Sequence, residues 1–130
     1  AEAFQKAGAS VVAVDPDPEM LIAARGFVPE LAAAAASAEA LPFSSASFDR
    51  AFMGMVLHET RDPIQSLTEM QRVVRAAAVV LEWPPSEPGQ PPPPARRFSP
   101  EELRELAIAA GFHRCDVLPL QHMILYSLKP

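Results

Sequence analysis

The feature that most constrains the fold of this chain is an apolar run that ends on an acidic residue and continues directly into a helix start. Residues 11–14 read Val-Val-Ala-Val, Asp15 follows them, and Asp17 with Pro18 suits a helix N-cap and first helical position. A buried strand with a carboxylate at its carboxyl end is typical of a nucleotide-binding α/β sheet, in which that carboxylate accepts hydrogen bonds from both ribose hydroxyls. The pattern predicts a nucleoside-bearing cofactor at Asp15; the alternative role for Asp15 is to cap the helix or the turn.

The start of the chain lacks the strand and glycine-rich turn that normally precede such a motif in a doubly wound sheet. Residues 1–8 read instead as the tail of an amphipathic helix closed by Gly8, and the first residue is Ala rather than Met. With 130 residues, 49% of them apolar, the chain is long enough for one hydrophobic core and too short for two. We therefore expect a single domain over residues 1–130, truncated at its N-terminus.

The remaining residues alternate between helix and strand patterns. An N-cap residue followed by Pro marks helix starts at residues 17–18, 62–63 and 99–100. Strands are expected over the apolar segments 31–36, 50–57 and 77–83, and over a C-terminal antiparallel hairpin formed by 112–118 and 122–128 with its turn at Pro119. Residues 84–98 contain four consecutive prolines and predict an extended loop. This order predicts an α/β fold with an antiparallel edge.

Composition narrows the classes of partner. The chain has 11 basic and 16 acidic side chains, so no basic surface favours nucleic acid or an anionic membrane. No apolar run approaches the roughly 20 residues that span a bilayer. The single cysteine, Cys115, cannot form an internal disulfide and is expected to be an inert core residue, and no paired Cys or His spacing indicates a metal site. We expect a cytoplasmic protein with no membrane or nucleic-acid partner.

Four short motifs occur in the order of one known family. They are residues 11–20; Ala-Glu-Ala-Leu-Pro-Phe at 38–43 followed by Ser-Phe-Asp at 47–49; Val-Leu-His-Glu at 56–59; and Phe-Ser-Pro-Glu-Glu-Leu at 98–103 followed by Ala-Gly-Phe at 110–112. Together they resemble the class I S-adenosylmethionine-dependent methyltransferases that act on small molecules, similar to those of ubiquinone and menaquinone biosynthesis. The resemblance implies a Rossmann-like sheet in the order 3-2-1-4-5-7-6, with the first strand missing here. It also implies S-adenosyl-L-methionine as cofactor and methyl transfer to a small-molecule acceptor.

The resemblance also implies site residues. Cofactor contacts fall on Asp15, Pro16, Met20, Ser37, Ala38, Glu39, Met53, Gly54 and Met55. In the family, the position of Met20 lies against the adenine and the loop at Ala38 closes on it through a backbone N–H. For Met20 and for residues 53–55 the alternative is plain core packing.

Catalytic candidates are His58 and Glu59, an adjacent titratable pair at a strand end that suits a general base or an orienting group for an acceptor hydroxyl. The alternative is that His58 packs beneath the following helix while Glu59 faces water. Trp83, Arg96 and Arg97 suit one wall and an anion-binding point for an acceptor, or are a rim Trp and two solvated arginines.

Three departures from the family keep other functions open. The glycine-rich loop is missing, Ser37 replaces the acidic residue expected before Ala38, and residues 75–78 replace the usual Arg-Pro-Gly-Gly turn. A nicotinamide-dependent dehydrogenase would equally suit the residues without the resemblance. A non-catalytic remnant or interaction subunit is the second alternative, and in that case sheet edges left open by the missing strand favour a homodimer.

Overall fold

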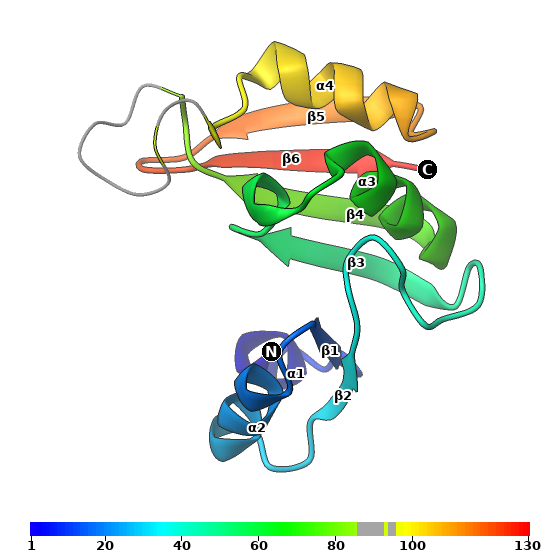
Figure 1. Cartoon of the computed structure of the whole chain (residues 1–130), viewed down its shortest axis with the longest axis vertical. Helices are drawn as coiled ribbons and strands as arrows, with labels where there is room; N and C mark the ends of the chain where they lie inside the picture. The colour runs from blue at the N-terminus through cyan, green and yellow to red at the C-terminus, as the bar shows by residue number, and fades with distance from the viewer. Residues whose placement is uncertain (86–92, 94–95) are drawn as a thin grey trace. The chain divides into compact units, whose positions relative to one another are not determined.

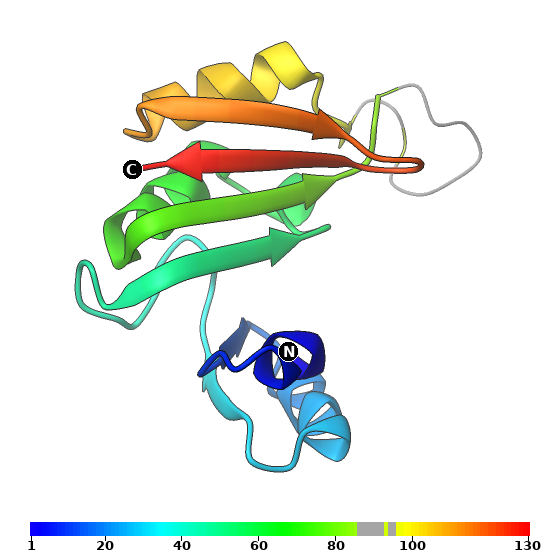
Figure 2. The same cartoon turned by 180° about the vertical axis from the view of Figure 1, so that it is seen from behind.

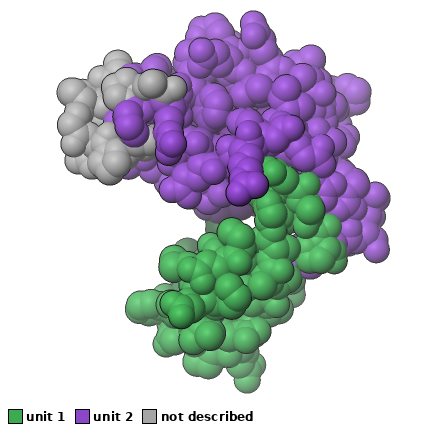
Figure 3. Space-filling view, in the orientation of Figure 1, with its two compact units in different colours: residues 1–42 green, residues 43–130 purple. Residues whose placement is uncertain are grey.

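The computed structural model describes residues 1–85, 93 and 96–130, which form two compact units, residues 1–42 and 43–130 (Figure 3). The first unit contains helix α1 (Glu2–Lys6), strand β1 (Val12–Asp15), helix α2 (Pro18–Phe27) and strand β2 (Ala32–Ala35) (Figure 1). Strands β1 and β2 are parallel, with Asp15 opposite Ala35, so their carboxyl ends lie side by side. Both strands and α2 were expected from the sequence.

Helix α2 begins where the sequence predicts. The Asp17 side chain accepts a hydrogen bond from the Glu19 N–H at 2.9 Å, and Pro18 occupies the first helical turn. Two leucines, Leu21 and Leu31, are the buried apolar side chains of this unit.

The second unit is a four-stranded mixed sheet with helices on one face (Figures 1 and 2). Its elements are β3 (Phe48–Gly54), the 3-10 turn η1 (Leu57–Glu59), α3 (Pro63–Val73), β4 (Val74–Glu82), α4 (Pro100–Ala109), β5 (Arg114–Pro119) and β6 (Ile124–Lys129). The strand order is β3-β4-β6-β5, in which β3 and β4 are parallel and both pairs with β6 are antiparallel.

The core of this unit lies between the sheet and helices α3 and α4. Its largest fully buried apolar and aromatic side chains come from η1, both helices, β4, β6 and the segment before β5: Leu57, Leu67, Leu103, Val80, Phe112, Tyr126 and Leu128. Asp62 caps α3 through the Gln65 N–H, and Ser99 and Glu102 form a reciprocal capping box at α4.

The strand order confirms the predicted α/β fold class. In family numbering β1 and β2 are the second and third strands, and β3-β4-β6-β5 is the sequence 4-5-7-6 of the expected order. Among the described residues, none forms the family's first strand.

Several boundaries differ from the expectation. Strand β3 ends at Gly54 rather than at residue 57, because Met55 adopts a left-handed φ of 60° and the chain then enters η1. Strand β4 begins at Val74, directly after α3, so the connection has no loop. The hairpin begins at Arg114, and its turn follows Pro119, closed by a hydrogen bond from the Leu120 N–H to the Met123 carbonyl.

Most of the proline-rich loop predicted over residues 84–98 lies outside the described residues. In the part of the chain that is described, no helix combines the length and apolar character needed to cross a membrane.

Candidate functional site

Asp15 ends β1 at the edge where both parallel strands of the first unit finish. Its Oδ1 accepts a hydrogen bond from the Asp17 N–H at 2.8 Å, and its carbonyl accepts one from the Ala36 N–H at 3.1 Å. The first bond orients the carboxylate, and the second joins the backbone of Asp15 to the segment that follows β2. Within the described residues Oδ2 has no hydrogen-bond partner, so this oxygen can accept a hydrogen bond from a ligand hydroxyl.

Residues 37–39 leave the same edge from the neighbouring strand. The Ser37 hydroxyl accepts from the Glu39 N–H at 3.1 Å, and the Ser37 carbonyl accepts from the Ala40 N–H at 3.1 Å. The N–H groups of Glu39 and Ala40 are thus both bonded within the turn, whereas the Ala38 N–H has no acceptor in the part of the chain that the structure describes. Asp15 and the Ala38 N–H are therefore an acceptor and a donor at one strand edge.

Two further predicted contacts, Pro16 and Met20, lie just beyond Asp15. Pro16 is exposed, and the Met20 side chain in the first turn of α2 is 57% exposed. The exposure of Met20 argues against core packing within its own unit and leaves an apolar side chain at the surface.

Residues 53–55 form the carboxyl end of β3 in the second unit. Met53 and Gly54 pair with Val80 and Leu81 of β4, and the Met55 N–H donates to the Leu81 carbonyl at 2.8 Å. A Cβ added at Gly54 would lie 2.8 Å from the Phe52 ring, so the strand end is tightly packed there.

His58, on η1, is held by a carboxylate from the neighbouring strand. Its Nδ1 lies 2.8 Å from Oε2 of Glu82, and its backbone N–H donates to Glu82 Oε1 at 3.2 Å. The two side chains are almost fully buried, 7% exposed for His58 and 3% for Glu82. Glu59, the predicted companion of His58, has its Oε1 3.8 Å from Nε2 and is 69% exposed.

Trp83 and Arg97 flank this pair. The Arg97 guanidinium carbon lies 5.8 Å from the Trp83 ring centroid, a cation–π distance, and Nη1 donates to the Pro84 carbonyl at 3.2 Å. Arg97 is buried, so it is not the solvated arginine of the alternative reading, whereas Arg96 is exposed.

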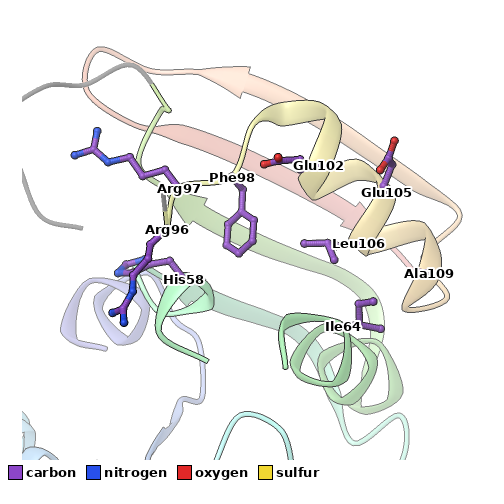
Figure 4. A pocket seen from close by; sticks show the side chains of 9 residues that line it. All are labelled: His58, Ile64, Arg96, Arg97, Phe98, Glu102, Glu105, Leu106 and Ala109. Atoms are coloured by element: carbon purple, nitrogen blue, oxygen red, sulfur yellow. The ribbon is translucent and has the colours of Figure 1, made fainter. Parts of the chain in front are cut away.

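A pocket of about 600 Å³ opens beside His58 in the second unit. Figure 4 shows Phe98 and Leu106 pointing toward the space between α4 and the start of α3, with His58 on its η1 side. The lining side chains are His58, Ile64, Arg96, Arg97, Phe98, Glu102, Glu105, Leu106 and Ala109.

The family that matches this sequence is described as "Methyltransferase domain", and the match runs over residues 1–81, more than half of the chain. The chain belongs to this methyltransferase family. The match includes β1, β2, β3 and most of β4, and with them Asp15, the turn at Ala38 and His58.

Similar proteins support this assignment. Uncharacterized methyltransferases of Mycobacterium tuberculosis and Mycobacterium bovis are 38% identical to the methyltransferase chain over 68 residues, which is 52% of this chain and 28% of each relative. The match thus spans less than a third of the length of these relatives.

Solved structures show the same fold. A SAM-dependent methyltransferase from Aquifex aeolicus superposes with a TM-score of 0.79 at 21% identity, covering 92% of this chain and 68% of that one. The trans-methyltransferase CalH in complex with SAH gives a TM-score of 0.75 at 17% identity, covering 93% and 43%. The Rossmann-like class I methyltransferase fold is therefore shown.

Sequence reasoning missed Glu82, the residue that holds the ring of His58. Glu82 lies 24 positions from His58, and it was visible only as the acidic end of a strand. A usable signal existed, because the carboxyl ends of adjacent parallel strands meet at one sheet edge; Glu82 is the last residue of one such strand, and His58 follows the end of the other.

Proposed function

We propose that this methyltransferase-family chain binds S-adenosyl-L-methionine and transfers its methyl group to a small-molecule acceptor. The observation that supports the proposal best is the pair formed by the Asp15 carboxylate and the Ala38 N–H at the carboxyl edge of the β1–β2 sheet. These residues suit the adenosine part of the cofactor, since the first accepts from ribose hydroxyls and the second donates to a ring nitrogen. Met20 offers an exposed apolar side chain for the adenine face.

The cofactor supplies a methyl group bonded to a sulfonium sulfur, from which it is readily transferred. Methyl transfer then needs an acceptor held in line, and the protein contributes by positioning that acceptor and excluding water. The pocket beside His58, at about 600 Å³, falls in the size range of about 300–1,000 Å³ typical of small-molecule sites. Its apolar walls and the net charge of −5 favour a small molecule over nucleic acid as the acceptor.

Calorimetric titration with S-adenosyl-L-methionine tests this function. We expect binding by the native protein and at least a tenfold weaker Kd for Asp15→Asn, because the amide loses charge-assisted bonds to the ribose. Asp17→Asn is the matched control: it removes the same charge two positions away and keeps an N-cap acceptor for α2.

The control should bind like the native protein. Equal weakening in both variants would assign the effect to net charge rather than to a ribose contact. A folded native protein that binds no cofactor would refute the proposal and favour a non-catalytic role.

A further inference from the structure

The buried contact between His58 and Glu82 fixes both the position of the imidazole ring and its tautomer. Both oxygens of the Glu82 carboxylate are engaged by one residue, Oε1 by the backbone N–H of His58 and Oε2 by its ring Nδ1. We propose that His58, oriented by Glu82, is the general base that removes a proton from the hydroxyl of an apolar ring-bearing acceptor, a phenol or an enol. This inference rests on the proposed function and names its acceptor class.

The contact decides which ring nitrogen carries the proton. A carboxylate only accepts hydrogen bonds, so the 2.8 Å contact at Oε2 requires a proton on Nδ1. The neutral ring then carries a lone pair on Nε2. Glu82 is thus a positioning residue that selects the tautomer in which Nε2 can accept a proton.

Nε2 is left available for a ligand. The nearest carboxylate oxygen on that side, Oε1 of Glu59, is 3.8 Å away and belongs to a side chain that is 69% exposed. That distance is too long for a hydrogen bond.

The pocket that His58 lines suits an apolar ring with an oxygen. Ile64, Phe98 and Leu106 supply apolar walls from α3, the segment before α4, and α4 itself (Figure 4). The charged side chains of the lining are two arginines, Arg96 and Arg97, and two glutamates, Glu102 and Glu105, so the lining carries no net charge that selects the acceptor. The preference for a hydroxyl comes instead from the lone pair on His58 Nε2, which can accept the proton of an O–H group.

The step balances in protons and electrons. The acceptor O–H proton passes to His58 Nε2, and the resulting imidazolium is stabilised by the Glu82 carboxylate at Nδ1. The acceptor oxygen uses its electron pair to form the bond to the methyl carbon, while the carbon–sulfur bond breaks and leaves its pair on sulfur. Exchange of the His58 proton with water returns the base.

Glu82→Gln tests the tautomer directly, without turnover. Its amide oxygen can accept from the His58 backbone N–H, and its NH2 group then faces Nδ1, which must give up its proton. We expect long-range ¹⁵N–¹H NMR to show the proton on Nδ1 of His58 in the native protein and on Nε2 in the variant. The protein has 3 histidines, so the signals can be assigned by substitution. Glu30→Gln, the same change at an exposed position, should leave the His58 signals unchanged.

Methyl transfer to 2-naphthol, with 2-naphthylamine as the matched nitrogen acceptor, tests the chemistry. A general base contributes about 10²- to 10⁴-fold, so naphthol turnover should fall at least 100-fold in Glu82→Gln while cofactor affinity by calorimetry stays the same. His58→Gln, which keeps an N–H donor toward Glu82, should lose naphthol turnover equally and serves as the second variant if the first fails to fold.

The outcomes separate the two proposals. Absence of cofactor binding by the native protein refutes the proposed function and leaves the tautomer result standing. If the native protein binds cofactor, three results overturn the assignment of His58 as a base for hydroxyl acceptors. They are no transfer to 2-naphthol, faster transfer to the amine, and turnover unchanged in both variants. An Nε2–H tautomer in the native protein overturns it as well.

Discussion

Replacing Tyr126 by Phe should stabilise the second unit. Tyr126 lies on β6 with none of its surface exposed, and its hydroxyl has no hydrogen-bond partner among the described residues. A buried hydroxyl without a partner costs about 1–3 kcal/mol of desolvation, and Phe keeps the ring while removing that group. Allowing for the small void left by the oxygen, we expect a gain of about 1 kcal/mol, or roughly 4–8 °C in Tm for a unit of this size.

The same residue predicts a loss of stability in alkali. Burial, with smaller contributions from the nearby Cys115 and Glu82, raises the pKa of Tyr126 from 10.0 to about 12. The native state therefore keeps the phenol proton at a pH where the unfolded chain has lost it. The contribution of the neutral phenol to stability is complete below pH 10 and is lost as the pH rises toward 12. The loss is on the order of 2 kcal/mol at the upper end.

The assay has an internal marker, because Tyr126 is the only tyrosine. Phenolate absorbance should rise near pH 12 in the native protein and near pH 10 in denaturant. Denaturant unfolding followed by circular dichroism should show a decline for the native protein between these values that Tyr126→Phe reduces. A native phenol that titrates near pH 10, or a Phe variant less stable than the native protein at neutral pH, would refute the reasoning.

Two further predictions concern local structure. Ser99→Ala removes the hydroxyl that caps α4 and should lower the free energy of unfolding in denaturant by about 1 kcal/mol. Ser45→Ala, at an exposed loop position, should cost nothing measurable. Equal stability of all three proteins would contradict the capping role. Burial raises the pKa of the Cys115 thiol, so iodoacetamide should alkylate the native protein at neutral pH more slowly than the unfolded protein. The difference in rate should narrow as the pH rises. An equally fast reaction of the native thiol would show that it is not shielded.

The sequence predicted the helix starts well because each depends on residues that are close together in the chain. Asp17, Asp62 and Ser99 each accept a backbone N–H two or three positions later, and a Pro follows each of them. A hydrogen bond within three residues needs no information about the rest of the fold. The predicted identities of these caps were therefore confirmed.

Strand boundaries were predicted less well because apolar character continues past the strands. Leu57 is fully buried, so residues 50–57 read as one apolar run, yet the strand itself stops at Gly54 and Leu57 packs from a 3-10 turn. Periodicity reports burial, and burial does not distinguish a strand from the turn that follows it. Val73 and Val74 are both apolar, so the sequence likewise did not show that α3 passes directly into β4 between them.

The candidate site was only partly predictable. Asp15 was found by its place at a strand end and the turn at Ala38 by the family resemblance, and their contacts to cofactor stay predictions. His58 was found as well, but its partner was sought in the adjacent Glu59, whereas the short contact is to Glu82 on the next strand. Side chains that meet across a sheet cannot be recognised from their spacing in the chain.

The backbone at Met55 gives this contact a structural reason. A left-handed φ of 60° at a residue other than glycine costs about 1 kcal/mol or more, and such strain persists where the surrounding structure requires it. Met55 still donates its N–H to Leu81, the residue before Glu82, so the parallel ladder continues to the last position before the chain turns. The turn then brings the backbone N–H and the ring of His58 to the two oxygens of Glu82. An extended conformation at Met55 would carry His58 onward along the strand direction, away from the Glu82 carboxylate. The strained residue thus accounts both for the early end of β3, which the sequence did not reveal, and for the orientation of the one buried histidine that lines the pocket.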